Sequence, residues 1–107
     1  AHGNGTRGSD ASEAAGIRRV FGNSVPPVTG LKWCVGHLLG ASGALDTVLA
    51  LRALQEKIVP GIATLKEVDP DCAGLPVSAK PQTPRSNKAL VICRGFGGMN
   101  VALVLGA

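Results

Sequence analysis

The stretch from Lys32 to His37, together with the apolar segment that follows it, constrains the fold of this chain more than any other feature. Apolar side chains recur at helical spacing from Leu38 to Lys57, which predicts the longest helix of the chain. His37 would open this helix at the positive end of the helix dipole, where a neutral imidazole is favoured, and the position suits catalysis. The small residues from Gly40 to Ala44 would let the helix start pack closely and become buried. The predicted inward side chains are Leu45, Val48, Leu49, Leu51 and Leu54, and the predicted outward ones are Asp46, Arg52, Gln55 and Glu56.

A second helix is predicted near the start of the chain. Asp10 and Glu13 have the spacing of an N-cap and its acidic N3 partner, which predicts a helix from Ala11 to Phe21 that Gly22 ends. The side chains expected on its inner face are Ala14, Ala15, Ile17, Val20 and Phe21.

Extended segments occupy much of the remaining sequence. Two apolar, β-branched runs near the C-terminus predict the buried strands of a hairpin, joined by the glycine-rich segment from Gly95 to Gly98. Shorter strands and turn-rich loops are predicted before them. The whole pattern indicates an α/β domain with a mixed sheet covered by helices. The predicted strands are Val28 to Trp33, Pro60 to Leu65, Leu75 to Ala79, Lys88 to Arg94 and Met99 to Leu105, and the predicted loops are Lys66 to Gly74 and Lys80 to Asn87.

Length and composition limit the class of protein. A chain of 107 residues forms one small domain, and a hydrophobic content of 45% is high for a free-standing one. Because Ala1 already lies inside a motif with no strand before it, we expect residues 1–107 to be a fragment whose upstream half is absent. No apolar run approaches the roughly 18 residues that span a membrane, and no signal segment opens the chain, so the expected location is cytoplasmic. Three cysteines, Cys34, Cys72 and Cys93, predict reduced thiols rather than disulfides.

The charge of the chain argues against a nucleic-acid partner. The net charge of +4 comes from scattered basic residues, and two phenylalanines and one tryptophan without a tyrosine offer no stacking platform. A basic face does suit an acidic protein partner. The candidates for such a face are Arg18, Arg19, Lys57 and Lys66, although a solvated surface explains any single one of them.

Three motifs follow one another along the chain. They are Ala1-His2-Gly3-Asn4-Gly5-Thr6 with Asp10 and Glu13, then Lys32 with Gly36-His37-Leu38-Leu39-Gly40-Ala41-Ser42-Gly43, and then Gly95-Phe96-Gly97-Gly98-Met99-Asn100. In order and spacing they resemble the motifs H-G-T-G-T, K-x-x-x-G-H-x-x-G-A-A-G and F-G-F-G-G-T-N of the β-ketoacyl-acyl carrier protein synthases. The resemblance covers nearly the whole chain and implies the C-terminal part of a thiolase-like fold with αβαβα layers.

The resemblance implies a condensing enzyme of fatty-acid or polyketide synthesis, a 3-oxoacyl-acyl carrier protein synthase. Its reaction is the decarboxylative Claisen condensation of malonyl-acyl carrier protein with an acyl thioester. His2 and His37 match two histidines that stabilise the enolate oxygen, as preorganised hydrogen-bond donors do. Lys32 matches a lysine that orders the site through a carboxylate, which Glu13 would supply here.

The resemblance also implies how substrate and partner are held. Asn4 and Thr6 would line the pantetheine tunnel, and Phe96 with Gly97 would form a mobile gate in front of the nucleophile. No cofactor or metal is implied, because the substrates are carried on the phosphopantetheine of an acyl carrier protein. A homodimer or heterodimer is implied for the full-length protein. The family's nucleophilic cysteine lies in an upstream segment, so we expect the 107-residue chain alone to be inactive.

Two residues depart from the family pattern. Asn4 replaces a threonine and keeps a donor and an acceptor on a longer side chain, so substrate handling is expected to differ. Arg94 replaces a phenylalanine and places a charge beside the gate loop, which is compatible with a polar or shortened acyl pocket. Neither departure predicts the acyl chain length.

Other interpretations of the same residues stay open. His37 can be a helix cap, and Gly95 to Gly98 can be a plain hairpin turn. Cys34 and His37 have C-x-x-H spacing, but structural zinc needs four ligands and no second pair is spaced for it. Cys34 as the nucleophile lacks a matching context. For the whole protein the alternatives are a non-catalytic partner subunit, like the chain-length factors of ketosynthases, and a small binding module complete in 107 residues. The two histidines and Lys32 favour the enzyme over the partner subunit.

Overall fold

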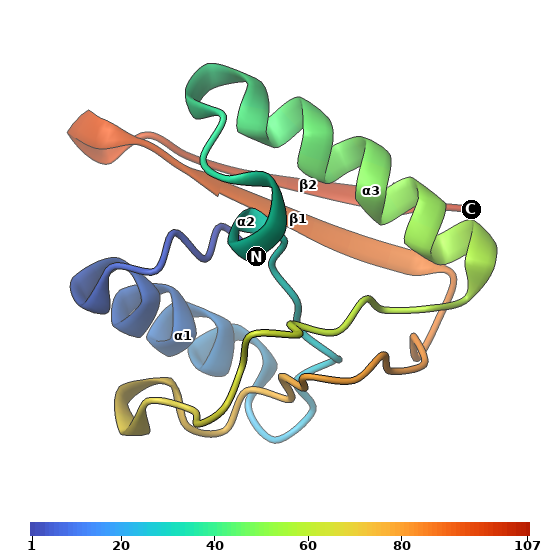
Figure 1. Cartoon of the computed structure of the whole chain (residues 1–107), viewed down its shortest axis with the longest axis horizontal. Helices are drawn as coiled ribbons and strands as arrows, with labels where there is room; N and C mark the ends of the chain where they lie inside the picture. Colours follow the sequence, from blue (N-terminus) through green and yellow to red (C-terminus); the bar gives the residue numbers. More distant parts are fainter.

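The computed structural model describes all residues from 1 to 107, and its only sheet is a C-terminal β-hairpin. Helix α3 (Ser42–Glu56) lies across one face of this hairpin, while α1 (Arg7–Phe21) lies near the end at which the two strands are joined (Figure 1). One helical turn, α2 (Lys32–Val35), stands beside the N-terminus of the chain. The remaining elements are the 3-10 turns η1 (Leu39–Ala41), η2 (Pro70–Cys72) and η3 (Phe96–Gly98), and the strands β1 (Lys88–Arg94) and β2 (Asn100–Gly106).

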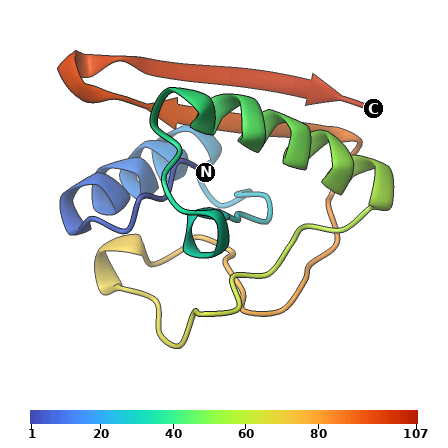
Figure 2. The same ribbon diagram turned by 45° about the horizontal axis from the view of Figure 1, so that its top comes forward.

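The predicted hairpin forms, but its outer strand is exposed. β1 and β2 pair antiparallel in a register that runs from Lys88 opposite Gly106 to Arg94 opposite Asn100. β2 lies at the edge of the molecule (Figure 2), and Val101 and Val104 are 57% and 68% exposed. The expectation of two buried strands is therefore wrong for β2. The sheet has only these two strands, so it is antiparallel and not mixed.

The three shorter predicted strands do not form. Lys32 and Trp33 belong to the helical turn α2, which the backbone bond from Gly36 N–H to the Lys32 carbonyl closes. The segments 60–65 and 75–79 run past each other with a single bond from Ile62 N–H to the Ser78 carbonyl, at 2.8 Å. Beyond them, Val59 and Gln82 form one isolated bridge. Proline lacks an N–H, so Pro60 and Pro76 interrupt the ladder that the apolar pattern predicts.

Helix α1 begins earlier than its sequence pattern indicates. It starts at Arg7 after Thr6, so Asp10 lies in the first turn and is not the N-cap. There its carboxylate still faces the positive end of the helix dipole. Ala14 and Ile17 are buried as expected, whereas Val20 is 78% exposed and Ala15 is also exposed. The inner face is therefore narrower than the sequence pattern predicts.

Helix α3 begins later than predicted. The segment from Leu39 to Ala41 forms η1, and the helix proper runs from Ser42 to Glu56. Leu39 is 75% exposed, so the start of this segment is not buried as expected. A close approach does occur at Gly43, where a Cβ atom would come within 2.8 Å of the Cys93 sulfur. A side chain at Gly43 would therefore require the Cys93 sulfur of β1 to move.

The inward face of α3 also differs from the prediction. Leu54 is buried, but Val48 is 62% exposed and Leu51 is exposed as well. Asp46, expected to face solvent, has a side chain that is only 15% exposed. Helical periodicity places the residues around the axis correctly, but it does not determine which neighbour covers each side.

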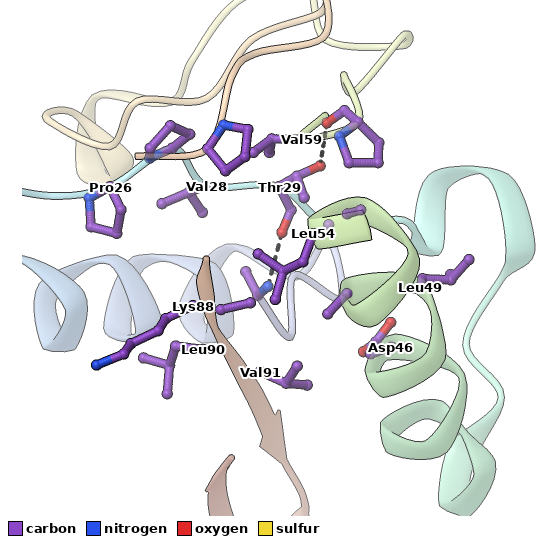
Figure 3. A pocket seen from close by; sticks show the side chains of 18 of the residues that line it. Pro26, Val28, Thr29, Asp46, Leu49, Leu54, Val59, Lys88, Leu90 and Val91 are labelled. Carbon is purple, nitrogen blue, oxygen red and sulfur yellow. Dashed lines mark hydrogen bonds between the residues drawn. The ribbon is translucent and has the colours of Figure 1, made fainter. Parts of the chain in front are cut away.

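An apolar cavity of about 190 Å³ lies between the segment 26–31, α3 and β1 (Figure 3). Val28, Leu54 and Val91 line it. At its edge the Thr29 carbonyl accepts a hydrogen bond from the Ala1 amino group at 2.8 Å. None of the site residues expected from the sequence lines this cavity.

No helix is both long enough and apolar enough to cross a membrane.

Candidate active site

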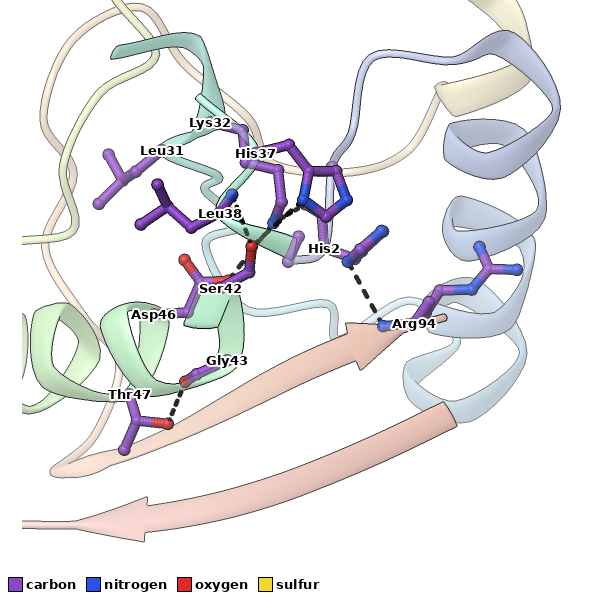
Figure 4. A network of polar contacts seen from close by, with 12 residues as sticks. His2, Leu31, Lys32, His37, Leu38, Ser42, Gly43, Asp46, Thr47 and Arg94 are labelled. Carbon is purple, nitrogen blue, oxygen red and sulfur yellow. Dashed lines mark hydrogen bonds and ion pairs between the residues drawn. The ribbon is translucent and has the colours of Figure 1, made fainter. Parts of the chain in front are cut away.

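Two histidines from distant parts of the chain lie side by side. The ring centroids of His2 and His37 are 5.5 Å apart, and the ring planes meet at 80° (Figure 4). His2 is only 4% exposed, whereas His37 lies on the exposed connector between α2 and η1. The fold thus brings the first two sequence motifs into one site.

Backbone amides determine which ring nitrogen carries the proton in each histidine. The N–H of Arg94 donates to His2 Nδ1 at 3.3 Å, and the N–H of Leu39 donates to His37 Nδ1 at 3.0 Å. Because a backbone N–H can only donate, both Nδ1 atoms must accept, and the proton of each neutral ring is assigned to Nε2. The Nε2 atoms of the two rings point to the same side in Figure 4. The pair therefore offers two N–H donors to one region.

The connector that carries His37 is built from unusual backbone. Gly36 ends α2 with a φ of +77°, and Leu39 has a φ of +51°, which a leucine seldom adopts. The preceding residue, Leu38, has a φ of −87° and a ψ of 16°, and this turn directs the Leu39 N–H back to His37. His37 precedes α3 by five residues and does not open it, so the expected helix-dipole effect at the helix start is replaced by a single amide donor.

The electrostatic environment keeps His2 neutral. Burial lowers the pKa of His2, and the nearby Lys32 ammonium lowers this pKa further, while the Glu13 carboxylate opposes them. A lowered pKa means that the imidazole is unprotonated at neutral pH. The neutral form is the one that the hydrogen bond from Arg94 requires.

Lys32 pairs with a carboxylate other than the expected one. Its Nζ lies 3.5 Å from Asp46 Oδ2 and donates to the His2 carbonyl at 2.6 Å. The Lys32 and Asp46 side chains are 8% and 15% exposed. The expectation that Glu13 pairs with Lys32 is therefore wrong. A sequence signal for Asp46 exists, because it is the only acidic residue between Glu13 and Glu56.

Glu13 instead holds the backbone of the first motif. Its carboxylate accepts the N–H of His2 at 2.7 Å and the N–H of Gly3 at 2.9 Å. Glu13 is 8% exposed, and charge-assisted bonds of this kind are strong when they are buried. Glu13 and Lys32 thus hold the N–H and the carbonyl of His2 from opposite sides.

Ser42, the first residue of α3, is a site residue that the sequence reasoning missed. Its Oγ accepts the N–H of Leu38 at 3.0 Å and lies 3.3 Å from His37 Nδ1 (Figure 4). Ser42 is only 6% exposed. Since the hydroxyl has no other acceptor among its contacts, it is placed to donate to His37. A serine five residues after a histidine is a weak signal, because no regular element fixes that spacing in advance.

Asn4 and Thr6, the expected pantetheine residues, are bonded to each other. Asn4 Oδ1 accepts the N–H of Thr6 at 3.0 Å and its hydroxyl at 2.8 Å. A cavity of about 480 Å³ opens beside them, and Asn4, Lys32 and His37 are among its lining residues. Thr6 does not line this cavity. With Oδ1 occupied, the Asn4 side chain offers its amide N–H groups to a ligand.

Phe96 and Gly97 lie apart from the other site residues. They form the tip of the hairpin in η3, where Gly97 has a φ of +77°. The Phe96 side chain is fully exposed and packs on nothing. Neither residue lines the cavity that contains His37, so the structure does not bring the expected gate to the site.

The cysteines do not join the site in a reactive form. Cys34 is exposed and donates to the Leu31 carbonyl at 3.1 Å, and Cys93 packs against Gly43. Burial raises the pKa of the Cys72 thiol, which disfavours the thiolate that a nucleophile needs. No three side chains of histidine, cysteine, aspartate or glutamate gather closely enough to hold a metal ion.

Comparisons with known proteins agree with the motif pattern. Residues 1–66 match the profile of the β-ketoacyl synthase C-terminal domain. A Streptomyces coelicolor protein that is named as an actinorhodin polyketide β-ketoacyl synthase 1 is 39% identical over 98% of this chain and 23% of its own length. The 3-oxoacyl-acyl-carrier-protein synthase 2 of Mycobacterium leprae is 36% identical over 99% of this chain and 25% of its own length. Nodulation protein E of Rhizobium meliloti is 35% identical over 96% of this chain and 26% of its own length. The chain spans about a quarter of the length of these relatives.

Proposed function

The chain belongs to the β-ketoacyl synthase family, and we propose that it supplies the histidine-containing part of the active site of a condensing enzyme. The reaction is the decarboxylative condensation of malonyl-acyl carrier protein with an enzyme-bound acyl thioester, in fatty-acid or polyketide synthesis. The full-length protein adopts thiolase-like layering in this proposal. It functions as a dimer with an acyl carrier protein as its partner.

The reaction has two bond-breaking steps. The bond between the malonyl α-carbon and its carboxylate breaks, carbon dioxide leaves, and the electron pair forms an enolate whose oxygen carries the negative charge. The α-carbon then attacks the acyl thioester, a carbon–carbon bond forms, and the carbon–sulfur bond breaks to return a thiolate. The barrier in the first step is set by the cost of placing negative charge on the enolate oxygen.

The observation that carries the proposal is the pair of Nε2–H donors on His2 and His37. Both Nδ1 atoms accept backbone amides, so neither ring can present a lone pair on Nε2 while it stays neutral. Such donors favour a developing oxyanion without giving up a proton. Removal of one preorganised donor of this kind typically costs about 10²-fold to 10³-fold in rate.

Lys32, Glu13 and Asp46 act by holding this pair in position. Lys32 and Glu13 fix the backbone of His2, and the ammonium of Lys32 adds positive potential beside the site. Asn4 binds the pantetheine arm through its free amide N–H groups. The nucleophilic cysteine is supplied by the rest of the full-length protein, because burial raises the pKa of Cys72 and the Cys34 thiol donates to the Leu31 carbonyl.

The test is release of carbon dioxide from malonyl-acyl carrier protein by the full-length protein. His2→Ala and His37→Ala should each slow the release by about 10²-fold or more. The double variant should lose less than the product of the two factors, because residues that act as a unit are not additive. Acylation of the nucleophile should persist in all three variants.

Near-normal release from His37→Ala would leave that histidine a structural residue and overturn the proposal. A wild-type protein that folds and pairs with a ketosynthase, but neither releases carbon dioxide nor becomes acylated, would support the non-catalytic partner subunit instead. Asn87→Ala is a suitable control, since Asn87 bonds the Ala107 carbonyl and does not line the cavity that contains His37.

A further inference from the structure

Arg94, the last residue of β1, contacts three separate parts of the fold. Its backbone N–H donates to His2 Nδ1 at 3.3 Å. Its Nη1 donates to the Ser9 carbonyl in the first turn of α1 at 2.8 Å, and its Nε donates to Asn100 Oδ1 at 3.4 Å. Asn100 is the residue with which β2 begins, two positions after the glycine-rich segment Gly95 to Gly98. Figure 4 shows Arg94 between the His2 ring and α1.

The sequence expectation for Arg94 was a charge that makes an acyl pocket polar or shorter. The residue does not line the cavity that contains His37 and Asn4. Its guanidinium is instead turned toward α1 and the start of β2. A planar guanidinium with five N–H donors can bind two acceptors in fixed directions, which neither lysine nor phenylalanine can do.

We propose that Arg94 is a positioning residue that holds the His2 ring by joining α1, β1 and β2 around it. The inference rests on the proposed function of the histidine pair. The side chain fixes the end of β1 relative to α1, and the amide of the same residue fixes the His2 ring. Because Glu13 on α1 holds the His2 backbone, both ends of His2 depend on the relative placement of α1 and β1.

The positive charge of Arg94, like its contacts, favours the neutral form of the His2 ring. The groups that face His2 are Glu13 and Asp10 of α1, Lys32 of α2, His37 of the connector and Arg94 of β1. Burial and Lys32 make the main contributions that lower the pKa of His2, and Arg94 adds a smaller one of the same sign. Loss of this cation should raise the pKa of His2 and move the acid limb of the rate profile to higher pH.

The test compares three variants of the full-length protein. Arg94→Met removes both the charge and the fork of donors, and Arg94→Lys keeps the charge but not the fork. Arg85→Met is the matched control, because Arg85 also donates to a backbone carbonyl, that of Ser24, in a part of the chain away from the histidines. Carbon dioxide release is measured against pH, and the His2 ring nitrogens are followed by ¹⁵N NMR after histidine labelling.

Arg94→Met should lower kcat for decarboxylation by about tenfold, with KM within about twofold, since small misplacements of a catalytic group have large rate effects. Its acid limb should move to higher pH, and the fraction of His2 protonated on Nε2 alone should fall. Arg94→Lys should lose rate but keep the position of the acid limb. Arg85→Met should match the wild type in every measurement.

An Arg94→Met protein with unchanged kcat, acid limb and His2 tautomer would overturn the inference while leaving the proposed function intact. An equal loss in Arg85→Met would also overturn it, since the effect would then be general. If the wild-type protein releases no carbon dioxide, the proposed function fails. The NMR arm still decides whether Arg94 holds the His2 ring.

Discussion

Removal of the Lys32 charge should destabilise the full-length protein by about 3 kcal/mol, because it leaves Asp46 without its ion-pair partner. The two side chains are 8% and 15% exposed and lie 3.5 Å apart. Asp46 Oδ2 is buried and makes no hydrogen bond that would replace the pair. Breaking a buried ion pair from one side typically costs about 3–5 kcal/mol, and the lower end applies because Asp46 is not fully buried.

A double-mutant cycle isolates this interaction. The variants Lys32→Met, Asp46→Leu and the double variant are compared by urea unfolding, and the coupling free energy should be about 1–3 kcal/mol. The double variant should recover part of the loss in Lys32→Met, since an apolar pair replaces an unpaired charge. The hydrogen bond from Lys32 to the His2 carbonyl is lost in Lys32→Met and in the double variant, so its free energy cancels in the cycle.

The control cycle pairs Lys32→Met with Glu13→Gln. Glu13 bonds the amides of His2 and Gly3 and forms no ion pair with Lys32, and the two residues share only the His2 backbone, so their coupling should be clearly smaller than the Lys32–Asp46 coupling. A Lys32–Glu13 coupling as large as the Lys32–Asp46 coupling would refute the assignment of Asp46 as the partner. An unchanged free energy of unfolding in Lys32→Met would refute the reasoning as a whole.

Four further predictions concern other parts of the chain. Ser42→Ala should slow carbon dioxide release by about 3-fold to 10-fold, as expected for the loss of one hydrogen bond of about 1 kcal/mol. It should also increase the population of the Nδ1-protonated tautomer of His37 in ¹⁵N spectra. An unchanged rate and tautomer would contradict a hydrogen bond from Ser42 to His37. Phe96 lies on a glycine-rich loop that can swing toward the site in the full-length protein, so Phe96→Ala should disturb the order of acylation and malonyl entry in stopped-flow kinetics. The melting temperature should not fall, because the side chain packs on nothing in this chain. Unchanged kinetics would show that Phe96 is not a gate. Because the pKa of His2 is lowered in the folded state, the contribution of His2 to stability is complete above the unfolded pKa of about 6.5 and is lost as the pH falls below that value. The urea midpoints at about pH 7.5 and about pH 5.5 should therefore differ more in the wild type than in His2→Gln. Equal differences in the two proteins would disprove the prediction. The isolated chain should self-associate in sedimentation experiments, since Val101, Leu103 and Val104 expose an apolar outer strand; a monomer at high concentration would contradict it.

The elements with a strong local pattern were the ones that the sequence predicted. The cores of α1 and α3 and the C-terminal hairpin follow from apolar periodicity and from the glycines between the strands. The segment from Val28 to Trp33 was assigned wrongly, because its apolar and β-branched residues are equally compatible with a strand. The turn α2 forms there because the Leu31 carbonyl accepts two amides, those of Cys34 and Val35. Such a hydrogen-bond pattern cannot be predicted from the composition of the segment.

The motifs of the candidate site could be found in the sequence, but the partners of each residue could not. His2 illustrates the reason: its N–H bonds Glu13 at a separation of 11 residues, its carbonyl bonds Lys32 at 30 residues, and its ring accepts the amide of Arg94 at 92 residues. Local patterns report on neighbours within a turn or two, whereas these three contacts require α1, α2 and β1 to be placed together first. Asp46 shows the same limit. Helical spacing predicts an outward position for Asp46, and only the tertiary fold brings Lys32 beside it. A histidine held by three distant segments has its orientation set by the tertiary fold, so substitutions in those segments should act on the His2 ring even when they do not touch a substrate.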